Sequence, residues 1–320
     1  MDSTDPFRGP PTSHANYRRP RPSFCEADYA VSRYIAEFIN SLASLFYVIY
    51  GIYGLRQLRR KANKSNPGNN DYLRALPYWG LKIVGLCLFS FHLSLKYHTQ
   101  IMHDLSTLFI IAPLLHRVLT GNVLVGESTR RAWTAKSARR ISTIIATVIV
   151  SLLLLLVTFN VMADELVVHS WWFLGSVVVI MIQTGPLNAS RTILLSNARE
   201  LSNARWQIYG MLRFGAITML IPGFYLSLIE YWACGFLTRA REAIGLPWAF
   251  LLELRGWCYI FTGIGAYTFA ALVDLLVSES DEDLKDLCAQ QTFAWPVSWA
   301  STSFLAGDPH QRMDVEEKEV

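Results

Sequence analysis

Four residues that could bind a metal ion or transfer protons lie close together in the sequence: His92, His98, His103 and Asp104. Imidazole and carboxylate groups are common zinc ligands and the usual acids and bases of hydrolytic sites. Ionisable residues inside or beside a membrane segment are functional candidates by default. The alternative for any single histidine is a solvated side chain at the membrane interface. For these residues to form a site, the helices and loops that carry them must bring them together.

The segments around these residues are apolar enough to lie in a membrane. Ile141 to Ala163 contains no charged residue and no proline. Roughly 20 apolar residues in a helix span the hydrocarbon core, and lipid satisfies no backbone hydrogen bond, so the stretch must be helical. Only 17% of the 320 residues are charged and 52% are hydrophobic, whereas a soluble domain carries about 25% charged residues. The sequence therefore predicts an integral membrane protein.

Seven apolar segments predict an all-α, polytopic fold, a bundle of seven transmembrane helices. They are approximately Tyr34–Leu58, Pro77–Tyr97, Leu105–Val125, Ile141–Ala163, Val168–Thr184, Trp206–Tyr231 and Trp257–Val277. Pro222 and Gly223 lie in the sixth segment, where a membrane helix accommodates them as a kink. The expected units are an N-terminal segment 1–33, a membrane domain 34–277 and an acidic tail 278–320, which we expect to be disordered.

Basic residues cluster after the first, third and fifth segments. The clusters are Arg56, Arg59, Arg60, Lys61 and Lys64, then Arg130, Arg131, Lys136, Arg139 and Arg140, then Arg191, Arg199 and Arg205. Short loops rich in Lys and Arg face the cytosol, so these clusters indicate topology rather than a nucleic-acid site. The loop after the sixth segment is a partial exception, with Arg239 and Arg241. This pattern predicts a cytosolic C-terminus and an N-terminus outside the cell or in a lumen; for the compartment we expect the endoplasmic reticulum or Golgi.

This topology gives the first testable prediction. A tag at the N-terminus should be protected from protease in sealed vesicles whose cytosolic face is outward, whereas a tag at Val320 should be digested. The basic clusters are the reason, because they hold their loops in the cytosol. Digestion of the N-terminal tag in intact vesicles would refute the arrangement.

Three stretches of the chain resemble signatures of the alkaline ceramidases, and the fungal members most of all. The first holds Cys25-Glu26, Tyr29, Ser32, Tyr34 to Phe38 and Asn40; the second Ser90 to Tyr97, Gln100 and Leu105-Ser106; the third Glu253-Leu254, Gly256-Trp257 and Phe261 to Tyr267. The resemblance covers nearly the whole chain and argues against a receptor of the rhodopsin type. It implies a seven-helix membrane amidase that uses a zinc-bound water to hydrolyse the N-acyl amide of ceramide.

The family's zinc positions are only partly kept. The resemblance places the ligands at His92 near the end of helix two and at two positions four residues apart on helix seven, which here are Arg255 and Tyr259. A catalytic zinc needs three protein ligands and an open site for water. Arginine has no lone pair to offer, and tyrosine ligates only as a phenolate, from a pKa near 10. We therefore expect the family's metal site to be incomplete.

The resemblance also implies catalytic and calcium-binding residues. The family's catalytic aspartate aligns with His103, the acidic residue after it is Asp104, and a serine on helix two is replaced by Leu88. A calcium site would use Glu26, Asp28 and Glu37, while Ser23 and Phe24 replace two further ligand residues. Calcium takes six to eight oxygen ligands, so its binding here would be weakened.

Two cysteines, Cys25 and Cys234, occupy positions that the family bridges with a disulfide. Both fall on the expected lumenal side, where disulfides persist; two free thiols are the alternative.

Three functions remain open at this stage, all with ceramide or another long-chain lipid as partner. The first is metal-dependent ceramide hydrolysis at a site rebuilt from donors such as His92, His98, His103, Asp104 and His169. The second is a catalytically inactive homologue that binds lipid or regulates an active relative, since a fold does not fix function. The third is a zinc-independent enzyme on another lipid-like substrate, in which Arg255 recognises an anionic group.

Overall fold

The structure is a computed structural model, and it describes residues 25–26, 29, 31–32, 34–62, 71–128, 135–163, 172, 174–185, 198–245, 247–277 and 293–302. The described elements are α1 (Phe38–Ala62), α2 (Asp71–Ser94), α3 (Tyr97–Ser106), α4 (Leu108–Ser128), α5 (Ala135–Ala163), the helix Leu174–Gly185, α7 (Ala198–Leu220), the π-helix η1 (Ile221–Leu226), α8 (Ser227–Ile244), the 3-10 helix η2 (Trp248–Leu252), α9 (Leu254–Val277) and α11 (Val297–Thr302). This confirms the all-α class.

Five stretches of helix in the described part of the chain are long and apolar enough to cross a membrane: Phe38–Arg60, Tyr72–Ser94, His98–Val123, Lys136–Phe159 and Leu254–Val277. The chain is therefore a polytopic membrane protein, as its composition predicts. The expected fifth segment corresponds to the helix Leu174–Gly185. The expected sixth corresponds to α7, η1 and α8, which follow one another without a break and extend to Ile244.

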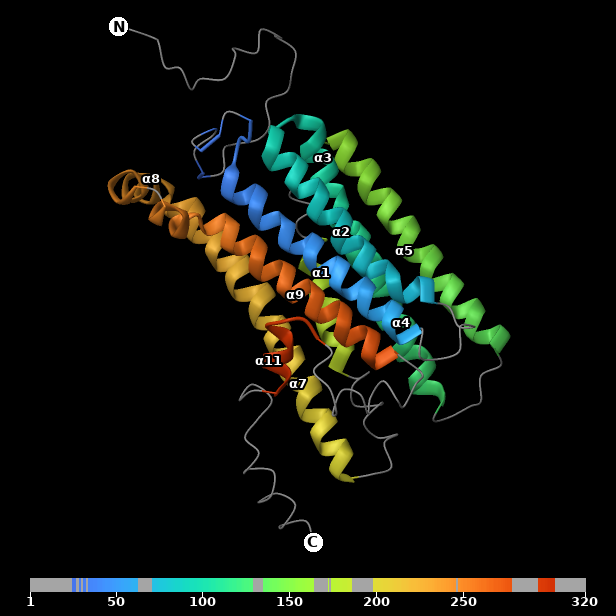
Figure 1. Ribbon diagram of the computed structural model, residues 1–320. Coiled ribbons are helices and arrows are strands. Elements are labelled where there is room, and N and C mark those ends of the chain that lie inside the picture. The colour runs from blue at the N-terminus through green and yellow to red at the C-terminus, as the bar shows by residue number, and fades with distance from the viewer. Residues whose placement is uncertain are drawn as a thin grey trace, which may run out of the picture.

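Helix α9 lies at the centre of the bundle, between α1 and α7, whereas α5 lies at its outer edge (Figure 1). Of the most apolar part of α9, 78% is buried inside the protein, against 11% for α5. Small residues let neighbouring helices approach α9 closely, as is usual in membranes. A Cβ added at Gly265 would lie 2.3 Å from the Cγ of Met219 on α7. The charge-free stretch of α5 thus faces lipid, while α9 holds the other helices together.

The second apolar segment ends earlier than the sequence suggests. Helix α2 stops at Ser94, because Leu95 has a φ of 47° and Lys96 is extended. The chain then enters the short helix α3, which precedes α4. The sharp turn brings the end of α2 and the whole of α3 to the same end of the bundle.

Three charged side chains join α2, α4 and α9 at the opposite end. Asp274 accepts from Arg74 at 2.9 Å and 3.0 Å, and the Nη2 of Arg117 lies 3.0 Å from Asp274 Oδ1. Asp274 and Arg117 are buried. An unpaired charge in such a place costs several kcal/mol, so the stability of this end of the bundle depends on these ion pairs.

Part of the acidic tail is ordered, which corrects the expectation of disorder from residue 278 onward. Ala294 donates its amide to the hydroxyl of Tyr267 at 3.2 Å, and Tyr50 donates to the carbonyl of Trp295 at 3.0 Å. Val297, in α11, is fully buried. The remaining residues of that tail lie outside the described part. The missed signal is the apolar run around Trp295, in which Ala294 and Val297 are buried against the bundle while Trp295 stays exposed.

The three-helix ion pair gives a second prediction. Asp274→Asn should lower the stability of the protein in detergent by about 3–5 kcal/mol, because two guanidinium groups then lose their shared carboxylate. The measurement is the unfolding temperature, with the exposed Arg139→Gln as a control that should change little. Equal unfolding temperatures for the two variants would contradict this role of Asp274.

Candidate functional site

His92 is completely buried and both of its ring nitrogens are engaged. Nδ1 lies 2.6 Å from Oε2 of Glu37, and Nε2 lies 3.0 Å from the hydroxyl of Tyr259. Asn40 donates to the same Glu37 oxygen at 2.8 Å. The carboxylate accepts from Nδ1–H, which leaves Nε2 to accept the proton of the Tyr259 hydroxyl. Glu37, His92 and Tyr259 thus form a continuous hydrogen-bonded chain across α1, α2 and α9.

Local backbone structure fixes this chain. Glu37 stands immediately before α1, and its amide donates to the carbonyl of His92 at 3.0 Å. The amide of Ala36 donates to the carbonyl of Leu93 at 3.2 Å. These bonds satisfy orphan groups at the two helix ends. The start of α1 is therefore held against the end of α2, which puts the Glu37 side chain beside the imidazole.

Arg255 forms an ion pair instead of facing His92 as a ligand. Its Nε lies 2.9 Å from Oε2 of Glu230, and its Nη1 donates to Ser227 at 3.5 Å. Glu230 and Ser227 both belong to α8, and Glu230 is buried. The guanidinium thus neutralises a carboxylate that would otherwise be buried without a counter-ion.

These residues do not fit the zinc site that the resemblance implies. The lone pair of His92 that would face a metal accepts the Tyr259 hydroxyl, and the third position carries the paired cation Arg255. A permanent cation offers no lone pair and repels a dication. Among the residues that the structure describes, no three His, Cys, Asp or Glu side chains lie close enough together to hold a metal ion.

His103 and Asp104 lie at the same end of the bundle as His92. Nδ1 of His103 lies 3.0 Å from Oδ1 of Asp104, so the two form their own pair. The ring of Phe91 stacks on His103, with centroids 5.6 Å apart, and also contacts His92, with centroids 5.0 Å apart. The fold therefore brings these histidines near one another, with Phe91 in contact with both. His98 is exposed, and His169 lies outside the described residues.

Of the residues expected at a calcium site, the two that the structure describes have other partners. Glu26 is buried, and its two carboxylate oxygens accept the amides of Ile39 at 2.7 Å and Asn40 at 3.0 Å. It thereby caps the N-terminus of α1, whose first amides have no partner within the helix. Glu37 contacts His92. Asp28, Ser23 and Phe24 lie outside the described residues, so the calcium site stays a prediction.

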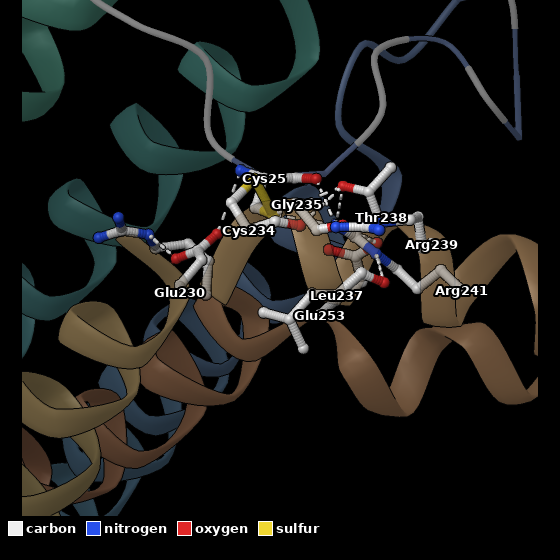
Figure 2. The surroundings of a disulfide bond; sticks show 10 residues. Cys25, Glu230, Cys234, Gly235, Leu237, Thr238, Arg239, Arg241 and Glu253 are labelled. Carbon is white, nitrogen blue, oxygen red and sulfur yellow. Dashed lines mark hydrogen bonds and ion pairs between the residues drawn. A yellow bond between two sulfur atoms is a disulfide. The ribbon is translucent and has the colours of Figure 1, made fainter. Parts of the chain in front are cut away.

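The disulfide between Cys25 and Cys234 is present, as expected (Figure 2). It joins the N-terminal segment to α8. The amide of Cys25 donates to Glu230 at 3.2 Å, and its carbonyl accepts from Arg241. Arg241 also pairs with Glu253. Arg241 is buried in α8, so this basic residue serves an internal ion pair and is not part of a basic loop at the membrane surface.

An apolar cavity begins one helical turn from Tyr259. Its enclosed space is about 70 Å³, and α1, α2, α4, α7, α9 and the helix Leu174–Gly185 supply its walls. Ile110, Leu114 and Phe269 are among its lining residues. Two hydroxyls, of Tyr47 and Thr262, lie 2.6 Å apart on its wall. Ligand cavities in proteins have volumes of roughly 300–1,000 Å³, so this cavity suits an alkyl chain by its apolar character and has to widen before it admits one.

Comparison with known proteins identifies the lineage. The model of the ceramidase family matches residues 10–305. The chain belongs to the ceramidase family. It is 25% identical over 259 residues to alkaline ceramidase YPC1 of Saccharomyces cerevisiae, which covers 79% of this chain and 75% of that protein. It is 23% identical over 264 residues to alkaline ceramidase 3 of Mus musculus, which covers 82% of each chain.

Sequence reasoning missed the main contacts of this ceramidase-family site. It assigned Glu37 to calcium, whereas in the structure this carboxylate holds His92. It proposed an anionic substrate group as the partner of Arg255, whereas in the structure Arg255 pairs with Glu230. Glu37 immediately precedes α1. Its position at the start of a helix was the only hint in the sequence that its carboxylate has a structural role. Nothing in the sequence pairs Glu230 with Arg255, because that contact depends on how α8 packs on α9.

Glu26 gives a third prediction. Burial raises the pKa of its carboxyl from 4.5 to about 7, against the opposing effect of the Ile39 and Asn40 amides. The folded chain keeps this proton where the unfolded chain loses it, so the contribution to stability is complete below pH 4.5 and is lost as the pH rises to about 7. Each pKa unit corresponds to about 1.4 kcal/mol.

Thermal unfolding as a function of pH tests this in detergent-solubilised protein. Glu26→Gln should flatten the fall in unfolding temperature between pH 4.5 and 7, because glutamine does not titrate. The exposed Glu242→Gln is the matched control and should keep the wild-type slope. Identical slopes for both variants would assign the pH dependence to other groups.

Proposed function

We propose that this ceramidase-family protein binds ceramide or a related long-chain amide without using a zinc-bound water to cleave it. The observation that carries the proposal is the hydrogen bond of 3.0 Å between Nε2 of His92 and the Tyr259 hydroxyl. It occupies the one imidazole lone pair that a metal would need. The protein is thus a lipid-binding or regulatory relative of the hydrolases, within sphingolipid metabolism.

The cavity supports the lipid-binding part of this proposal. Its walls are mostly apolar, and two of its polar wall residues lie near Tyr259: Thr262 donates to the Tyr259 carbonyl at 3.3 Å, and its hydroxyl lies 2.6 Å from that of Tyr47. An alkyl chain in the cavity would bring its polar end toward Tyr259. Apolar walls with a few placed polar groups are typical of sites for amphiphilic ligands. We place the protein in the endoplasmic reticulum or Golgi membrane with its N-terminus in the lumen.

Zinc-dependent amide hydrolysis is the competing function, and family membership favours it. It would require His92 to exchange its tyrosine partner for a metal, with His103 and Asp104 as further ligands or proton carriers. In the structure those two residues pair with each other. A zinc-independent enzyme that uses Arg255 against an anionic lipid would have to displace Glu230 from the guanidinium. Both alternatives need contacts to be broken first.

Metal content and ceramide binding separate these functions. Purified protein should contain no stoichiometric zinc, bind a fluorescent ceramide and release no fatty acid from it. An active hydrolase would carry about one zinc per chain, since such sites hold a single ion. Zinc that is lost on His92→Ala, together with zinc-dependent hydrolysis, would refute the proposal.

Restoring the family's ligands tests the same point from the other direction. The double variant Arg255→His/Tyr259→His should gain zinc, because three imidazoles then surround one position. Arg139→His/Tyr72→His, at two exposed positions, is the matched control and should gain none. If the native chain already hydrolyses ceramide and the double variant adds nothing, the interpretation of Tyr259 as a blocking partner is wrong.

A further inference from the structure

The long helix formed by α7, η1 and α8 extends beyond the end of the bundle. Its antiparallel contacts with α9 locate that end: Ser227 lies 3.4 Å from Cys258, and Glu230 lies 2.9 Å from Arg255. Arg255 is the second residue of α9. Helix α8 continues past Glu230 to Ile244. At 1.5 Å per residue, this extension is roughly 20 Å long.

One side of the extension carries large apolar side chains. Trp232 is 78% exposed and Phe236 is 70% exposed. The same exposed strip begins in the segment that the sequence predicts as the sixth span, at four-residue steps through Ile217, Ile221, Tyr225 and Ile229. Residues at this spacing share one helix face. The apolar surface on α8 is therefore continuous with the exposed apolar face of α7 and η1, which would meet hydrocarbon if this segment spans the membrane.

The other side of α8 is fixed to the protein. Glu230 and Arg241 on that side are buried, and Cys234 forms the disulfide with Cys25. Figure 2 shows these side chains gathered toward the N-terminal segment and Glu253. The orientation of the helix about its axis is therefore set, and its aromatic side must face outward.

The axis of α8 also differs in direction from that of α7. In Figure 1 the ribbon of α8 turns away from the line of α7 at the end of the bundle. Pro222 lies in the π-helix η1, and proline and π-helical turns are usual causes of helix bends. After α8 the chain returns through η2, where Trp248 and Leu251 are also exposed.

We propose that the hairpin of α8 and η2, residues Ser227–Leu252, lies in the lipid headgroup region on the disulfide side of the membrane, with Trp232, Phe236 and Trp248 in contact with lipid. The headgroup layer adds only about 5–8 Å on each side of the hydrocarbon. A straight continuation of roughly 20 Å would carry these aromatic rings into water. Tryptophan and tyrosine favour the interface, where amphipathic helices lie with their apolar face in the acyl boundary.

The charges on the exposed side indicate which lipid surface fits. Arg239 and Glu242 are exposed on α8 and cancel each other in net charge. The contact therefore depends on apolar burial and not on attraction to anionic headgroups. A membrane of zwitterionic phosphatidylcholine is therefore sufficient to bind this hairpin.

Depth measurements on the full chain test this proposal. The three cysteines other than Cys25 and Cys234, which are Cys87, Cys258 and Cys288, are changed to serine. The disulfide is kept, and Phe236→Cys is labelled with an environment-sensitive fluorophore in phosphatidylcholine nanodiscs. Arg59→Cys serves as the aqueous control and Leu155→Cys, on the outer face of α5, as the hydrocarbon control. The label at position 236 should emit to the blue of that at 59, resist quenching by iodide, and be quenched most strongly by lipids that carry a nitroxide near the headgroup.

Each other outcome overturns the proposal. Iodide quenching equal to that at position 59 would place the hairpin in water. Strongest quenching by deep nitroxides, as at position 155, would place it in the hydrocarbon. Protection from both quenchers together with crosslinks between chains would show that a second copy covers the strip. Trp248→Cys, labelled in the same way, must give the same depth as position 236, or the hairpin does not lie in the interface as one unit.

Discussion

Lipid offers no water to a buried charge, and this constraint organises the helices. At one end of the bundle Asp274 neutralises Arg74 and Arg117. At the other end Glu230 pairs with Arg255 and Glu253 with Arg241. Unpaired charges in such surroundings are strongly destabilising. These pairs join α2 and α4 to α9, and α8 to α9, so the positions of the helices follow from which charges must meet.

The same constraint accounts for the altered site. A bare imidazole in the interior needs partners for both nitrogens, and in this chain Glu37 and Tyr259 supply them. An arginine buried at this position would be strongly destabilising alone, and Glu230 compensates it. Tyr259 and Arg255 therefore form a self-consistent polar arrangement beside His92. The apolar cavity lies next to this polar cluster.

Much of the fold could be predicted from the sequence because the hydrophobic signal is long and strong. The predicted span Ile141–Ala163 lies within α5, which begins earlier, at Ala135. The disulfide between Cys25 and Cys234 was predicted by resemblance and not by local pattern. The turn at Leu95 and the docking of residues around Trp295 were missed, because single residues and tertiary burial decide them. The pairing of Glu230 with Arg255 depends on helix packing, which hydropathy does not encode.

The link between Cys25 and Cys234 spans 209 positions of the chain. Glu26, which caps the first helix, stands next to Cys25, and the partner cysteine lies in α8. During synthesis the ribosome makes α8 long after α1 has entered the membrane. The amino-terminal stretch can therefore be joined covalently to α8 only after the late helices have been made.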